Sequence, residues 1–395
     1  MIDSIAAVGD AGDINCWSGI PYHFGEAARR TGLKARPWRL PLEDFVWPRR
    51  LWNLRQGVLA RGLGGYQYSD AFLDRAENTL AQADWSGRIV TFNQHFPRAR
   101  SVSARGGRLA IYVDATLASL CVPGGLLTGL PSRVREQACA RERENYALSE
   151  HVVTMARWAA DSMVKDCGVP TQKVHTILPG ASLFLPEDHS FSTEAGEPGR
   201  ERPLVLGFVG KDWIRKGLPF LLQVRDMLER MGAKTVVRCA GNCPDDLHRT
   251  GGLEYAGFIN KARDPARFVE FLSSCDVGCL FSAHEPLGIS TLEFLRAGVP
   301  VAGFCVEGIA DTLPPDAGFR FEPTATAEEV ATVLWKAFRE PQTVAALRGA
   351  SRRWSPYVTW RRCIAEWLEL LGTGKIGRPV QPWCGLPMAD SEARH

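Results

Sequence analysis

Two glutamates, Glu285 and Glu293, lie in a segment whose residue types could bind hydroxyl groups. Residues 282–293 read Ser-Ala-His-Glu-Pro-Leu-Gly-Ile-Ser-Thr-Leu-Glu, after a run typical of a buried strand and before a pattern typical of a helix. Glu285 would then precede the helix and Glu293 would lie along it, at two depths of one pocket. Carboxylates so placed are good acceptors for sugar or ribose hydroxyls. The alternative is that both are solvated helix acids.

The start of the same helix is a candidate anion site. Pro286 and Gly288 favour a turn, and we expect Ser290 or Thr291 to cap the first helical turn. Backbone N–H groups at a helix start have no partner within the helix and can bind an anion. The amides expected to face such a ligand are those of Leu287, Gly288 and Ile289.

A second candidate anion site is the cationic segment 210–217, which contains Lys211, Arg215 and Lys216 between glycines. It follows a predicted strand, 204–210, and precedes an amphipathic segment typical of a helix. A strand-to-helix turn with cations and closely approachable backbone suits a diphosphate. The alternative is a basic surface turn. The segment contains neither a P-loop nor the Gly-x-Gly-x-x-Gly dinucleotide pattern.

Parallel sheets are the elements that would position these groups. Short apolar or β-branched runs alternate with helical patterns in both halves of the chain, which predicts an α/β fold with two Rossmann-like domains facing a central cleft. The residues from 183 to 202 break this alternation with prolines, acids and glycines. The predicted strands are 88–92, 109–113, 151–155, 204–210, 235–239, 276–281 and 299–304.

The composition is that of an ordinary globular protein: 395 residues, 45% hydrophobic and 23% charged, with a formal charge of +3. No apolar run approaches the ~18 residues of a membrane-spanning helix, and the first residues do not resemble a secretion signal, so we expect a cytoplasmic protein. The 11 cysteines form no Cys-x-x-Cys pair and are expected to be reduced. No nucleic-acid-binding signature is present.

Arginines make residues 1–180 more basic than the rest of the chain. The simplest interpretation is a solvated surface. The alternatives are an anionic acceptor or peripheral contact with an anionic membrane, such as the inner face of the cell membrane.

In these motifs the chain resembles the retaining glycosyltransferases of family 4, which have GT-B architecture and a carboxyl-terminal donor-binding domain. The resemblance is close over roughly residues 149–312 and exists only in outline before them. Its parts are the Glu-x7-Glu spacing of Glu285 and Glu293, the Ala-Gly-Val-Pro-Val of 297–301, the glycine loop 308–311 and the cationic segment 208–217. Gly257, in Ala-Gly-Phe-Ile, falls where the family has a nucleotide-contacting turn.

The resemblance also implies candidates in the first domain. Gly19, in Trp-Ser-Gly-Ile-Pro, resembles the turn that reaches toward the donor phosphate and the acceptor. Asp114 follows the strand 109–113 where many members have a histidine, so it could orient an acceptor or steady positive charge at the anomeric carbon; alternatively it caps the next helix. Lys211 replaces the family's usual arginine. His23 and His95 are weaker candidates.

The resemblance implies transfer of a sugar, with retention, from a UDP- or GDP-sugar donor to an unknown glycan, lipid or small-molecule acceptor. Lys211, Arg215, Lys216 and the helix amides would bind the diphosphate, Glu285 the sugar and Glu293 the ribose. We expect Asp114, Glu285 and Lys216 to act at the reacting centre. No Asp-x-Asp pair occurs, so neither a metal nor another cofactor is expected. The alternatives are a GT-B nucleotide-sugar epimerase or a non-catalytic nucleotide-sugar-binding protein.

The expected organisation has five parts. They are an acceptor-side domain (1–182), a linker (183–202), a donor domain (203–354), a helix crossing back to the first domain (355–371) and a loosely ordered tail (372–395).

Overall fold

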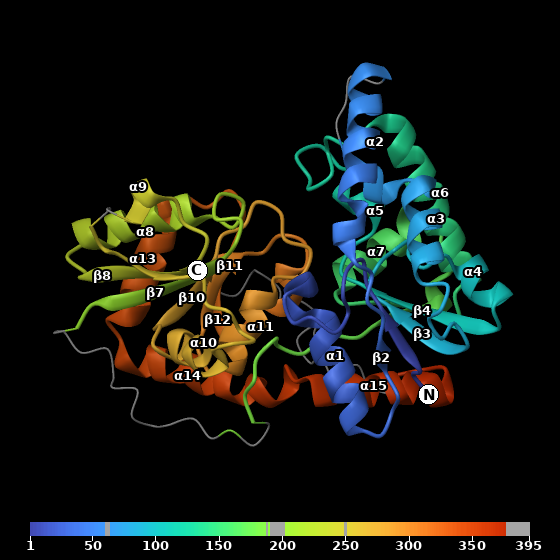
Figure 1. Cartoon of the computed structure of the whole chain (residues 1–395). Helices are drawn as coiled ribbons and strands as arrows, with labels where there is room; N and C mark the ends of the chain where they lie inside the picture. Colours follow the sequence, from blue (N-terminus) through green and yellow to red (C-terminus); the bar gives the residue numbers. More distant parts are fainter. Residues whose placement is uncertain (60–63, 187–188, 190–201, 249–250, 377–395) are drawn as a thin grey trace. The chain divides into compact units, whose positions relative to one another are not determined.

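The computed structural model describes residues 1–59, 64–186, 189, 202–248 and 251–376. The chain divides into two compact units (Figure 1). Unit 1 comprises Met1–Pro179 together with the segment that begins at Trp360, and unit 2 begins at Gly180 and ends at Thr359. Most of the expected linker and the tail from residue 377 lie outside the described residues.

Unit 1 is built on a parallel sheet of six strands in the order β2-β1-β3-β4-β5-β6. Because every strand is parallel to its neighbour, the carboxyl ends of all six strands lie at one edge of the sheet. The strands are β1 (Ser4–Ala6), β2 (Arg36–Pro37), β3 (Gly87–Thr91), β4 (Gly107–Val113), β5 (His151–Thr154) and β6 (Val174–Thr176).

Helices connect these strands, as parallel pairing requires, and one more helix joins unit 1 from the end of the chain. They are α1 (Ile20–Arg30), α2 (Val46–Leu59), α3 (Asp70–Thr79), α4 (Ala99–Ala104), α5 (Leu117–Leu120), α6 (Ser132–Leu148), α7 (Arg157–Lys165) and, from the end of the chain, α15 (Trp360–Thr373). Short 3-10 turns occur at Cys16–Gly19, Leu42–Phe45, Tyr66–Tyr68 and Thr171–Lys173.

Helix α15 completes the core of unit 1 although it follows the whole of unit 2 in the sequence. Trp367 is fully buried, and its ring centroid lies 5.6 Å from that of Phe24 in α1 and 5.3 Å from that of Tyr112 in β4. The Tyr112 hydroxyl donates to the Ile177 carbonyl at 2.7 Å. Arg362 of α15 donates to the Leu178 carbonyl. Apolar packing and hydrogen bonds therefore both hold α15 on unit 1.

Unit 2 has a second parallel sheet of six strands, in the order β12-β11-β10-β7-β8-β9. The strand order reverses between β10 and β7, and in such sheets ligands bind beyond the carboxyl ends of the strands at this position. The strands are β7 (Leu204–Gly210), β8 (Thr235–Gly241), β9 (Leu253–Gly257), β10 (Val277–Leu280), β11 (Val301–Phe304) and β12 (Gly318–Phe321).

Helices cover both faces of this sheet, with α8 and α13 packed together on one side and α10 and α11 on the other (Figure 1). The helices are α8 (Leu218–Arg230), α9 (Asp245–His248), α10 (Pro265–Ser273), α11 (Ile289–Arg296), α12 (Ile309–Thr312), α13 (Ala327–Phe338) and α14 (Pro341–Trp354), followed by a 3-10 turn at Ser355–Tyr357.

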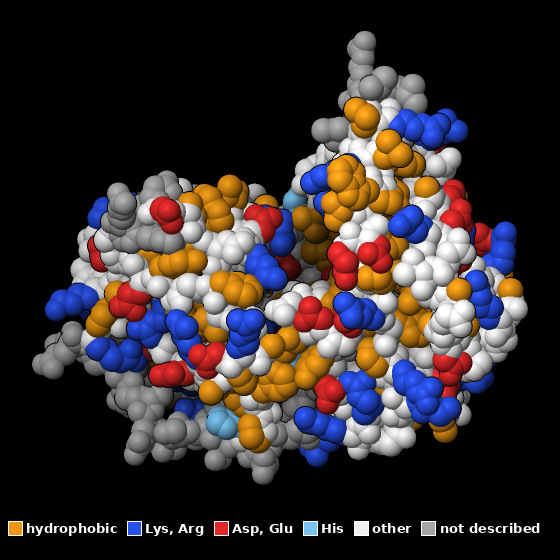
Figure 2. Space-filling view, viewed as in Figure 1, with side chains coloured by type: hydrophobic (Ala, Val, Ile, Leu, Met, Phe, Trp, Pro, Cys, Tyr) orange, Lys and Arg blue, Asp and Glu red, His pale blue; other side chains and the backbone are white. Residues whose placement is uncertain are grey.

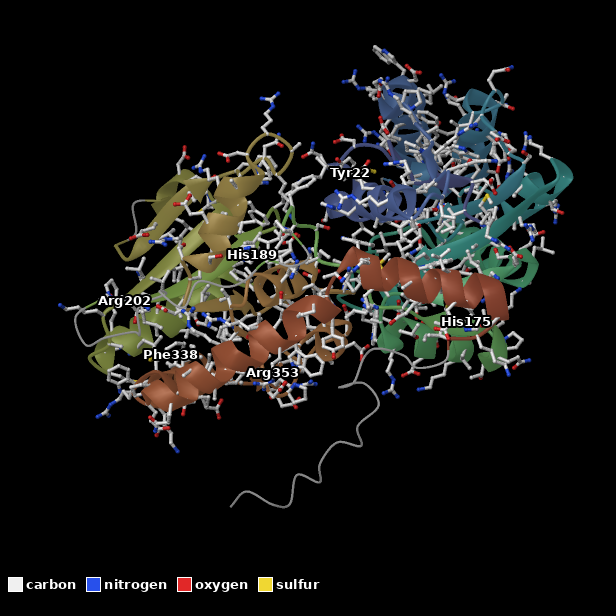
Figure 3. All side chains as sticks on the ribbon, turned by 90° about the horizontal axis from the view of Figure 1, so that it is seen from below. Tyr22, His175, His189, Arg202, Phe338 and Arg353 are labelled. Carbon is white, nitrogen blue, oxygen red and sulfur yellow. The ribbon has the colours of Figure 1, made fainter. Side chains whose placement is uncertain are left out.

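A buried carboxylate, Asp276, joins three elements at the amino-terminal edge of this sheet. It pairs with Arg202, which is labelled in Figure 3, at 2.7 Å and with Arg348 of α14 at 2.9 Å. It also accepts a hydrogen bond from the Val205 amide at 2.9 Å. Two cations and an amide compensate the loss of hydration of this buried charge.

The expected α/β class with two Rossmann-like domains is confirmed, and each predicted strand is present with ends shifted by at most a few residues. The short strands β1, β2, β6, β9 and β12 were not predicted. In the described part of the chain, no helix combines the length and apolar character needed to cross a membrane.

Candidate active site

The cationic turn lies between β7 and α8, at the carboxyl edge of the second sheet. Gly217 has a left-handed φ of 80° at the start of α8. A Cβ at this position would lie 2.2 Å from the Phe281 carbonyl oxygen, so only glycine lets the turn approach the end of β10 so closely. This approach brings the cations of the turn to the segment that contains Glu285.

Two of these cations converge on one carboxylate. Lys216 Nζ lies 2.8 Å and Arg215 Nη1 lies 3.1 Å from Glu285 Oε2, and the carboxylate is nearly buried. Arg215 also donates to the His284 carbonyl at 2.6 Å. The structure thus brings together Arg215, Lys216 and Glu285, which lie about 70 residues apart in the sequence.

The Glu285 carboxylate is held in its charged form. Burial by itself would raise its pKa, but the nearby charges and hydrogen bonds of Lys216 and Arg215 outweigh burial and lower the pKa below its usual value. Arg215 also pairs with Asp212, at 3.1 Å, so carboxylates already neutralise part of the charge of the two cations. Lysine and arginine each carry several donor hydrogens, so both side chains can also bind an anionic ligand.

Glu307 belongs to this site but was not recognised in the sequence. Its carboxylate accepts a hydrogen bond from the Glu285 amide at 2.7 Å and lies 2.9 Å from His284 Nδ1. Its backbone φ of 45° is in the left-handed region, which is unusual for a residue other than glycine. Glu307 therefore fixes the backbone from which Glu285 projects.

Helix α11 begins as expected beyond Gly288, but its capping differs from the prediction. Gly288, with φ of 73°, is the residue at the amino-terminal cap, and no side chain caps the helix. The expectation that Ser290 or Thr291 would cap it is wrong, because both residues lie inside the helix and are buried. A glycine cap contributes no side-chain acceptor to compete with a ligand for the first amides.

Glu293 lies within α11 and is 1% exposed. Its partner is Lys261, from the loop after β9, whose ammonium forms an ion pair with Glu293 Oε1. Burial raises the pKa of Glu293 above its usual value, although Lys261 opposes this effect. Lys261 was not recognised in the sequence, since nothing in its spacing indicates a partner in α11.

Two further candidates lie at the ends of two strands of the second sheet. Lys211 follows β7, and its ammonium lies 5.5 Å from the centre of the exposed Phe258 ring. Gly257 ends β9 with φ of 78°. Both lie at the carboxyl edge of the sheet, where β7 and β9 flank β8.

The two candidates in unit 1 lie at turns. Asp114 directly follows β4, but the alternative that it caps the next helix is wrong, because Thr116 caps α5 and accepts from the Ser119 amide at 3.1 Å. Gly19 is the cap residue of α1 and the last of three consecutive residues with left-handed φ, after Trp17 and Ser18. Such a run is strained for residues with side chains.

The two histidines considered in unit 1 are buried. His95 lies with Nε2 3.0 Å from the Gln67 carbonyl, and burial lowers its pKa to about 4. His23 packs with its ring stacked on Trp360, at 6.4 Å between ring centres. Across the described ranges, no group of three His, Cys, Asp or Glu residues is arranged to hold a metal ion.

Unit 1 also contains a cavity of about 460 Å³. Apolar side chains and polar ones, including Arg49, Asn53, Tyr66, Leu126 and Leu130, line it. Such mixed lining is common in pockets that bind small organic ligands.

Comparisons with known proteins agree with this geometry. Residues 203–338, which contain the cationic turn, Glu285 and Glu293, match the family model of group 1 glycosyl transferases. The D-inositol 3-phosphate glycosyltransferase of Xylanimonas cellulosilytica is 25% identical over 259 residues, and the match covers 61% of each chain. The 2-deoxystreptamine glucosyltransferase of Streptomyces kanamyceticus is 27% identical over 159 residues, 38% of this chain and 40% of the relative.

Solved structures with the same fold include a sucrose-phosphate synthase from Thermosynechococcus elongatus, with a TM-score of 0.67 and 14% identity, which covers 94% of this chain and 100% of that one. HepE of Anabaena in complex with UDP-glucose has a TM-score of 0.56 and 15% identity, over 75% of this chain and 82% of that one. At such identities the likeness concerns the fold.

Two Rossmann-like units, with a cationic turn beside a carboxylate in the second, define a protein of GT-B architecture. Within that architecture, residues 203–338 of the second unit are similar to the group 1 glycosyl transferases.

Proposed function

We propose that the protein is a retaining glycosyltransferase of the family 4 type, which transfers a sugar from a UDP- or GDP-sugar to an acceptor hydroxyl. The observation that carries the proposal is the convergence of Lys216 and Arg215 on Glu285 beside the glycine-capped start of α11. An anionic diphosphate and a hydroxyl-rich sugar are together the ligand that such a set of groups fits.

The donor diphosphate would bind the ammonium of Lys216, the guanidinium of Arg215 and the amides of 287–289, with Lys211 at the rim. These groups stabilise the negative charge that grows on the diphosphate as its bond to the anomeric carbon breaks. The acceptor oxygen forms its bond to that carbon on the same face, and the departing phosphate oxygen takes the acceptor proton. No protein nucleophile is needed in this sequence of steps.

Each glutamate has a separate role in this proposal. Glu285, charged and beside the cations, would accept hydrogen bonds from the transferred sugar. Glu293, deeper in α11, would accept hydrogen bonds from the ribose, with Lys261 compensating its charge. Gly257, at the end of β9, would let the backbone approach the nucleotide.

Unit 1 would bind the acceptor. Asp114 would orient it or steady positive charge at the anomeric carbon, and the turn at Gly19 would contribute a backbone amide. The cavity lined by Arg49 and Tyr66 has room for an acceptor group. Support for the donor class comes from a solved structure of the same fold, HepE of Anabaena, which is in complex with UDP-glucose.

The proposal includes activity without a metal ion, because cations and helix amides meet the diphosphate charge. The test is a panel of UDP- and GDP-sugars incubated with the purified protein after exhaustive chelation, scored by nucleotide release and by the anomeric configuration of the product. Release of nucleotide with a retained anomer is expected. An inverted product, or turnover only after magnesium or manganese is restored, would contradict the proposal.

A further inference from the structure

Helix α2 of unit 1 exposes three large apolar side chains: Trp47 is 74% exposed, Leu51 69% and Leu54 67%. With 3.6 residues per helical turn, positions 47, 51 and 54 lie on a single stripe along the helix. A soluble domain exposes single apolar residues routinely, but a stripe of such large ones along one helix face indicates a binding surface.

Arginines flank this stripe on both sides. On a helix of this pitch Arg50 lies next to Leu54 on one side, and Arg55 lies next to Leu51 on the other. Both arginines are exposed, and the Arg50 guanidinium lies 5.0 Å from the centre of the Trp47 ring. No Asp or Glu occurs within α2.

The opposite face of α2 is already used in folding. Trp52 donates from Nε1 to the Gly64 carbonyl at 2.9 Å, and its ring lies 6.0 Å from that of Tyr66. Asn53 accepts from the Gly64 amide at 3.2 Å. These contacts fix the rotation of the helix, so the apolar stripe is directed away from the core. Figure 2 shows hydrophobic and basic side chains side by side on the surface formed by α2.

We propose that α2 binds the surface of a lipid bilayer rich in anionic phospholipid. The stripe of Trp47, Leu51 and Leu54 enters the boundary between headgroups and acyl chains, while Arg50 and Arg55 contact lipid phosphates on either side. An apolar stripe between cations is the pattern of helices that lie in the plane of a membrane surface.

Charge argues against a second copy of the same helix as the occupant. In a symmetric pair the same surface meets itself, so Arg50 and Arg55 would face arginines of the other copy across the contact. Like charges brought together in this way oppose association, whereas an anionic lipid surface neutralises them. The bilayer is therefore the occupant that satisfies both the apolar and the basic groups.

The test is flotation of the full-length protein with vesicles of phosphatidylcholine alone and of phosphatidylcholine mixed with phosphatidylglycerol, without donor or acceptor. We expect binding to the anionic vesicles that weakens as salt is raised. The variant Trp47→Ser/Leu51→Ser/Leu54→Ser should lose binding. Arg50→Gln/Arg55→Gln should weaken binding to anionic vesicles about 30-fold, at one basic residue's usual contribution each.

The matched control is Leu148→Ser/Val333→Ser, which removes side chains that are 54% and 43% exposed elsewhere in the chain and should bind as the parent does. Circular dichroism and nucleotide binding check that each variant is folded. Absence of binding to anionic vesicles, or equal binding by the stripe variant, would overturn the proposal. So would a dimer in analytical ultracentrifugation that the stripe variant abolishes, if no vesicle binding accompanies it. None of these outcomes depends on transferase activity.

Discussion

Lys216 is the residue whose removal most directly tests the diphosphate site, because its ammonium lies 2.8 Å from Glu285. Lys216→Ala should weaken binding of a nucleoside diphosphate by one to two decades, since a hydrogen bond between charged groups is typically worth ~1.5–3 kcal/mol. Titration calorimetry measures this change directly. Lys234→Ala, an exposed lysine of the same unit, should bind as the parent does, and equal affinities for all three proteins would remove Lys216 from the site.

The two glutamates are predicted to differ in what their loss changes. Glu285→Gln should lower kcat and leave affinity for the free nucleoside diphosphate near normal, because its contact with the sugar strengthens as charge develops. Glu293→Gln should weaken the binding of free nucleotide by about one to two decades, because a hydrogen bond to the ribose contributes equally to binding in the ground state and in the transition state. The roles are reversed if Glu285→Gln abolishes nucleotide binding while Glu293→Gln leaves it unchanged.

Asp114 is predicted to affect transfer more than donor binding. Since Thr116 is the residue that caps α5, replacing Asp114 by Asn removes a charge without removing a cap. Asp114→Asn should lower kcat for transfer and leave the dissociation constant of the donor unchanged. Steady-state kinetics with the donor found in the panel gives the first quantity and calorimetry the second. Transfer at the parental rate would show that the charge is not used.

Residue types and spacing were sufficient to predict Lys216, Arg215 and Glu285 as site residues, because each belongs to a short sequence motif at a strand-to-helix turn. Lys261 and Glu307 carry no such pattern. Lys261 contacts Glu293, 32 residues further along the sequence, and Glu307 contacts Glu285, 22 residues before it. Only the folded sheet brings such pairs together, so a single sequence could not have shown them.

At the scale of elements, most buried apolar strands were predictable, even four-residue ones such as β5 and β10, whereas most exposed or partly buried strands were not. β7 and β4 are buried along nearly their whole length and therefore appear as apolar runs. By contrast, β2 is a pair of exposed residues and β6 is only partly buried, so pairing with a neighbour defines them rather than composition. The capping error in α11 arose because glycine in a left-handed conformation replaced the expected hydroxyl cap.

Helix α6 contains a buried carboxylate, Glu142, that should make the stability of unit 1 depend on pH. Glu142 accepts from the Leu117 amide and from the Tyr146 hydroxyl, both at 2.8 Å, and burial raises its pKa from 4.5 to about 7. The folded protein therefore holds a proton that the unfolded chain releases at lower pH. This contribution to stability is present in full below pH 4.5 and is lost as the pH rises through about 7.

Glu142→Gln keeps both accepted hydrogen bonds and cannot ionise. The melting temperature of the variant should therefore rise relative to that of the parent as the pH is increased through about 7, and the two should converge under mildly acidic conditions. Thermal unfolding followed across this pH range checks the sign. A constant difference between the two proteins would show that Glu142 does not titrate in the folded state.

At the scale of the whole molecule, the structure predicts that a substitution in α15, near the end of the chain, destabilises unit 1, which is formed mainly by the first 179 residues. Trp367→Ala removes a fully buried side chain that contacts Phe24 and Tyr112, and such truncations typically cost ~3–5 kcal/mol. Hydrogen exchange should accelerate in α1 and β4 and stay unchanged in β7 and β10. Leu368→Ala, at a more exposed position of the same helix, should have little effect, and acceleration in both units would contradict the assignment of α15 to unit 1.

The placement of α15 affects the order in which the two units can complete their folding during translation. The strands and helices of Met1–Pro179 leave the ribosome first, yet the helix that covers Phe24 and Tyr112 is made only after all of Gly180–Thr359. During translation the second unit can finish its core while the first still exposes apolar surface, which is the condition in which nascent chains recruit chaperones. The half of the chain that is synthesised first is therefore the half that completes its folding last.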